Sequence, residues 1–186
     1  GNLELAWLIP LALIGTVCGW LYFVSEHASE AFAHAIGERP VVKAMLAGLA
    51  LAICGTVLPY TMFAGETQAG VLMETYLTIP AGVLIATGLV KAMLTPALIN
   101  LGWRGGHFFP VIFSGVSLGY GLAILTGADP VFCVAVCTAS TMGAVMRQPV
   151  MVVGLLLMCF PLKGIVCMII AAVIAAGIPL PKPLRK

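Results

Sequence analysis

Charged side chains are scarce in this sequence of 186 residues, because Asp, Glu, Lys and Arg together make up only 9% of it. A soluble domain carries about 25% charged residues, since its surface faces water. The formal net charge is only +2, too small to indicate nucleic acid as a partner. The shortage of charge therefore excludes an ordinary soluble domain, and nothing in the composition indicates binding to nucleic acid.

Two further patterns are missing. The six cysteines include no Cys-x-x-Cys pair and fall inside apolar stretches, where free cysteine behaves as a small hydrophobic residue. We therefore expect neither a disulfide nor a zinc site, and no cofactor. The sequence also lacks the alternating pattern of a membrane β-barrel, and open sheet edges cannot be satisfied in lipid. Strands are not expected.

Long uncharged runs are abundant, and hydrophobic residues make up 61% of the chain. A helix needs roughly 17 to 25 apolar residues to cross the hydrocarbon of a bilayer. The longest uncharged runs are Leu5–Ser25, Ala44–Gly65, Gly105–Ala128, Pro130–Met146 and Gly164–Pro181. We predict an all-α, polytopic integral membrane protein, in which residues 1–186 form a single transmembrane domain.

Glycine and proline divide the chain into seven or eight expected helices, some too short to span a bilayer. Gly37 and Pro40 end the first helix, and Asp129 before Pro130 has the pattern of an N-cap. We expect a loop over 60–68. The expected helices cover about 5–36, 40–58, 69–77, 82–99, 110–125, 130–147, 149–160 and 162–178. Short, broken helices recur in transport proteins, where their ends line a polar pathway.

The segment Gly105-Gly106-His107-Phe108-Phe109-Pro110 has the composition of an anion site. Its two glycines predict a tight turn that a ligand can approach closely, and Pro110 suits the first turn of a helix. The amides of His107, Phe108 and Phe109 would then be unpaired donors at the positive end of that helix. Arg104 would attract anions toward a pore mouth. The alternative is a capped helix start in a loop, with Arg104 at the lipid headgroups.

The same segment resembles the Gly-x-Phe-x-Pro motif of the CLC family of chloride channels and proton-coupled chloride exchangers, here Gly106, Phe108 and Pro110. The stretch from Ala139 to Pro149 is similar to the small-residue helix of that family, which ends in Thr-Arg-Ala-Pro. Together with Leu58-Pro59, the helix containing Lys91, and Gly115 to Gly121, the resemblance covers nearly the whole chain. It is a resemblance to the second half of a CLC subunit.

The resemblance implies transport of chloride or a similar small anion, held by the amides of His107 and Phe108, and not an enzyme. It also implies a CLC-type inverted-repeat fold, a homodimer that forms through about 148–160 and 162–178, and a bacterial inner membrane. The first-half motifs of the family, with its pore serine and gating glutamate, are not in this sequence, which begins with Gly. We therefore expect a missing N-terminal half as a further partner.

The basic tail formed by Lys182, Arg185 and Lys186 predicts a cytoplasmic C-terminus by the positive-inside rule.

Two alternatives from other classes stay open. His27, Glu30 and His34 lie at helical spacings, and two histidines with a carboxylate on one helix face can bind a metal. The pattern fits an intramembrane metalloenzyme, and an amphipathic helix end that faces water gives the same pattern. The second alternative is a helical scaffold that associates with partners and conducts nothing.

Overall fold

A computed structural model describes residues 2–162 and 164–185, and these residues form helices and connecting loops with no strand. Eight α-helices follow in order: α1 Asn2–Ile36, α2 Pro40–Val57, α3 Glu66–Thr75, α4 Ala81–Asn100, α5 Phe108–Thr126, α6 Pro130–Met146, α7 Pro149–Cys159 and α8 Ile165–Gly177. Three short 3₁₀ helices are η1 Pro59–Thr61, η2 Tyr76–Thr78 and η3 Lys182–Leu184. The all-α prediction is confirmed. Lys163 and Lys186, which the sequence placed in the last helix and in the basic tail, lie outside the described residues.

The helix ends follow the glycine and proline pattern of the sequence. Asp129 caps α6 as predicted, because its carboxylate accepts a hydrogen bond of 2.9 Å from the amide of Phe132. The predicted loop over 60–68 is shorter than expected, since α3 begins at Glu66. The N-cap residue of α3, Gly65, has a φ of 102°, and the acidic side chain of Glu66 suits the positive end of this helix.

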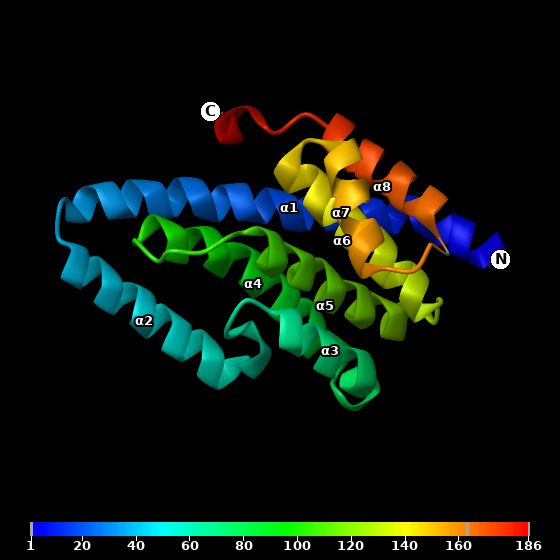
Figure 1. Cartoon of the computed structure of the whole chain (residues 1–186), viewed down its shortest axis with the longest axis horizontal. Helices are drawn as coiled ribbons and strands as arrows, with labels where there is room; N and C mark the ends of the chain where they lie inside the picture. The colour runs from blue at the N-terminus through cyan, green and yellow to red at the C-terminus, as the bar shows by residue number, and fades with distance from the viewer. Residues whose placement is uncertain (1, 163, 186) are drawn as a thin grey trace.

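The most buried helices are α5 and α6, which pack against each other at the centre of the molecule. α1 and α4 cover them on further sides, and α8 packs against α6. In Figure 1, α1 (blue) runs along one side of α4 and α5, while α2 (cyan) and α3 lie along the other side. α7 and α8 lie beside α6.

Small residues allow these helices to pack closely. A Cβ on Gly115 of α5 would lie 2.5 Å from the Cα of Thr138 on α6, and one on Gly119 would lie 2.5 Å from the Cα of Val134. α1 and α6 are also close, since the hydroxyl of Thr141 donates to the Gly15 carbonyl at 3.2 Å. Backbone contact of this kind is how helices associate in lipid, where apolar side chains gain little by leaving the hydrocarbon.

Four of the described helices are long and apolar enough to cross a membrane: α1, α2, α4 and α5. The 35 residues of α1 would extend about 52 Å, well over the roughly 30 Å of a hydrocarbon core, so it must be tilted or emerge from it. Of the 18 residues of α2, only Ala47 is buried inside the chain. The exposed apolar side chains of this helix have the character of a lipid-facing or partner-facing surface.

Candidate anion site at the start of helix α5

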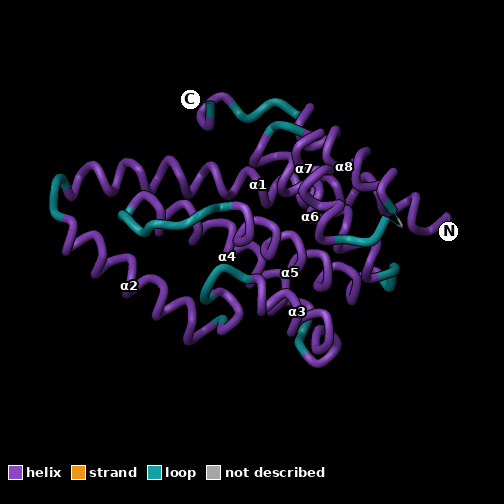
Figure 2. Tube along the Cα trace, viewed as in Figure 1, coloured by secondary structure: helices purple, strands orange, loops and turns teal. Residues whose placement is uncertain are grey.

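The approach to the candidate site begins where α4 ends. The amide of Gly102, whose φ is 96°, donates to the Ile99 carbonyl, and the amide of Trp103 donates to the Leu98 carbonyl, both at 3.0 Å. This pair of bonds is the Schellman arrangement that ends a helix at a glycine. Residues 103–106 then continue without helix or turn, and Figure 2 shows this extended connection between α4 and α5.

The tight turn predicted at Gly105 and Gly106 is wrong, because the chain turns earlier, at Gly102. Neither Gly105 nor Gly106 has a positive φ, and a Cβ on either would meet nothing within 4 Å. Packing within the described residues therefore does not require glycine at these two positions. What the two glycines provide is an exposed backbone with open space beside it.

Helix α5 begins at Phe108, with His107 as the N-cap residue. The first backbone bond of the helix runs from the amide of Val111 to the His107 carbonyl, at 3.1 Å. Within the described residues, the amides of His107, Phe108 and Phe109 donate to no protein acceptor. Pro110 lies in the first turn of the helix, as predicted, and has no N–H to satisfy. Its side chain is buried. Three amide donors are therefore available at the positive end of a 19-residue helix.

The ring of His107 packs against two aromatic rings. Its centroid lies 4.7 Å from that of Phe108, nearly parallel at 18°, and 6.3 Å from that of Tyr22 on α1. This packing holds the N-cap residue against α1. Phe109, by contrast, is 48% exposed.

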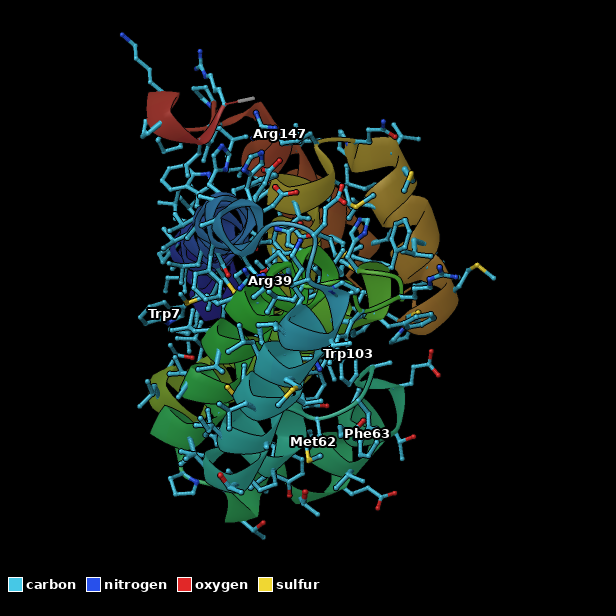
Figure 3. The ribbon with its side chains drawn as sticks, turned by 90° about the vertical axis from the view of Figure 1, so that its left-hand side faces the viewer. Trp7, Arg39, Met62, Phe63, Trp103 and Arg147 are labelled. Atoms are coloured by element: carbon cyan, nitrogen blue, oxygen red, sulfur yellow. The ribbon has the colours of Figure 1, made fainter. Side chains whose placement is uncertain are left out.

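A cavity of about 240 Å³ borders the glycine pair. Its wall includes Gly105, Gly106 and Pro110, together with the exposed Arg104 and the buried Lys91 of α4. The remaining lining residues carry no charge: Leu51, Phe63, Ala64, Thr95, Leu98, Ile99 and Trp103. Figure 3 shows Phe63 and Trp103 on the same side of the molecule. Two cationic residues and an exposed backbone thus line one cavity next to the α5 start.

Another cavity, of about 640 Å³, is less suited to an anion. It is lined by Glu4 and Asp129, whose carboxylates repel negative charge, and the residues of the α5 start do not line it.

Lys91 is not among the site residues predicted from the sequence. Its side chain is only 3% exposed, and its ammonium donates to the Thr61 carbonyl at 2.7 Å and to the Phe63 carbonyl. One feature of the sequence could have identified it, because Lys91 is the only charged residue in α4. A single ionisable residue within an apolar helix is by itself a reason to suspect function.

The metal site considered on α1 finds no support in the structure. Among the described residues, no group of three or more His, Cys, Asp or Glu side chains could hold a metal ion. The Nδ1 atom of His27 lies 3.1 Å from the Phe23 carbonyl one turn earlier. His27, Glu30 and His34 are therefore on one helix but do not form a ligand set.

Comparison with known proteins identifies the family. A family model described as voltage gated chloride channel matches residues 2–179, which is nearly the whole chain. No curated protein and no solved structure matches the chain. Together with the apolar helices, this match shows that the chain is an integral membrane protein of the CLC chloride channel and exchanger family, whose members transport anions and are not enzymes.

Proposed function

We propose that the chain moves chloride or a similar small anion across the membrane and holds it at the start of α5. The amides of His107 and Phe108 are the proposed donors, with that of Phe109 next to them. Gly106 leaves room for the approach of the anion, and Pro110 fixes the first turn. Exposed Arg104, on the wall of the adjoining cavity, attracts anions toward the site.

One observation carries this proposal: amides without a protein acceptor at the start of a long helix, beside a cavity whose charged wall residues are both cations. The positive end of the helix dipole and free N–H groups favour an anion. Because backbone amides carry only partial charge, the anion is held weakly enough to leave again.

The proposal extends to the assembly and its orientation. We propose that residues 1–186 act as one transmembrane domain and as the second half of a CLC-type inverted repeat, which an N-terminal half or a second copy completes. α7 and α8 are the proposed dimer contact, supported by exposed apolar side chains such as Val150 and Met158, both 86% exposed. The basic tail supports a cytoplasmic C-terminus in a bacterial inner membrane.

Chloride efflux from liposomes that contain the complete natural protein tests the proposal. The test variant replaces both Gly106 and Pro110 with alanine, and Gly70→Ala on α3 is the matched control. A Cβ at Gly106 or at Gly70 meets nothing within 4 Å, so neither glycine substitution should disturb packing. We expect efflux to fall strongly in the test variant and to stay at the wild-type rate in the control. Unchanged efflux in the test variant would count against the site.

A further inference from the structure

Lys91 lies in the middle of α4, a helix long and apolar enough to cross the membrane, and its side chain is 97% buried. Its ammonium donates two hydrogen bonds, one to the Thr61 carbonyl and one to the Phe63 carbonyl. An ammonium has three N–H donors and no acceptor. One donor of Lys91 is therefore left after its bonds to the Thr61 and Phe63 carbonyls.

Among the residues that the structure describes, the charge of Lys91 has no anionic partner. No carboxylate forms an ion pair with it within the part of the chain that the structure describes, and its two acceptors are neutral carbonyls. Burying a charge without a counter-charge is costly in a protein interior and in a membrane. The carbonyl dipoles offset part of that cost, and an anion beside the ammonium would offset more.

The cavity next to the α5 start is the place for such an anion, because Lys91 forms part of its wall. At about 240 Å³ it has room for several water-sized groups, each of which takes about 30 Å³ in the liquid. Arg104 adds a second positive charge, and no acidic residue lines the cavity among the described residues. Apolar wall residues lower the local dielectric constant and so strengthen the attraction of both cations for an anion.

We propose that the cavity between Lys91 and the Gly105–Gly106 backbone binds a small inorganic anion such as chloride, with the remaining N–H of Lys91 as its charged donor. This position is additional to the one held by the amides of α5. The inference rests on the proposed function for its place on a transport pathway, since the same glycine pair borders both positions. Binding itself depends only on the cavity and its cations.

Chloride-dependent thermal stability of the complete natural protein tests the inference. A ligand that binds only the folded state raises stability with its concentration. Chloride is exchanged against gluconate, a large organic anion, at constant ionic strength. Chloride affinity is read from the rise of thermal stability with chloride concentration. We expect Lys91→Met to lower this affinity about tenfold or more, because a charged donor is lost. Lys91→Arg should keep most of the chloride affinity. Lys182→Met, at an exposed position, should have the wild-type chloride affinity.

Lys91 also holds the 61–63 segment, in which Phe63 has a φ of 62°, so Lys91→Met is expected to lower stability at every chloride concentration. A uniform loss of stability with an unchanged chloride dependence would overturn the inference and leave Lys91 as a structural clamp. The proposed function fails by a different result, namely unchanged efflux when Gly106 and Pro110 are replaced. The two failures are therefore distinguishable.

If Lys91→Met does not fold, bromide can be located in the wild-type protein by anomalous scattering. A bromide peak within hydrogen-bonding distance of the Lys91 ammonium supports the inference. Bromide at the start of α5 with none in this cavity overturns it.

Discussion

Removing a single backbone donor at the start of α5 would measure what one amide contributes to anion binding. An ester in place of the peptide bond that precedes Phe108 replaces its N–H with oxygen and keeps the side chain. This amide donates to no acceptor within the described residues, so the change breaks no backbone hydrogen bond seen in the fold. A hydrogen bond to a charged group contributes about 1.5–3 kcal/mol, so chloride affinity should fall about 10- to 150-fold.

Isothermal titration of chloride into the complete natural protein measures this change. The matched control is an ester at Val111, whose N–H already donates to the His107 carbonyl at 3.1 Å. The control should lose about 0.5–1.5 kcal/mol of stability, the net contribution of one such bond, and keep its chloride affinity. Wild-type chloride affinity in the Phe108 ester would refute the reasoning, because the amide would then not contact the anion.

Three further predictions concern the fold and the rejected metal site. Gly115→Ala should lower the stability in detergent by about 1–3 kcal/mol, because its Cβ would lie 2.5 Å from the Thr138 backbone. Gly70→Ala, with open space around it, should not, and equal stability of the two variants would contradict the packing. Asp129→Ala should cost about 1 kcal/mol in the same unfolding assay by removing the cap of α6. His27→Ala should leave chloride efflux at the wild-type rate and bound metal unchanged; lost efflux accompanied by lost metal would restore the metal hypothesis.

Local signals explain why most helix ends were predictable. Two adjacent residues, Asp129 and Pro130, specify the start of α6. The carboxylate of Asp129 accepts from a free amide of the first turn, and the ring of Pro130 fixes a helical φ. Local signals did not specify where the chain turns after α4, and the sequence prediction placed that turn too late. Gly102, Gly105 and Gly106 are all compatible with a positive φ, and only the bonds back to α4 select Gly102.

Contacts between distant segments were not predictable from sequence pattern. Lys91 bonds to carbonyls about 30 residues earlier, and Asn100 donates to the Ser29 hydroxyl, 71 residues away, at 2.8 Å. Such pairs depend on how the helices are arranged, which composition and periodicity do not specify. The helix-start motif was therefore visible in the sequence, whereas the cavity with its buried cation was not.

The central claim is that peptide N–H groups at the start of α5 hold an anion within the membrane-embedded protein. Locating bromide by anomalous scattering in crystals of the complete natural protein tests it most directly. We predict a bromide peak within hydrogen-bonding distance of the amides of His107 and Phe108. A structure in which those amides face lipid acyl chains or bind carbonyls of another segment, with no bromide nearby, would contradict the account.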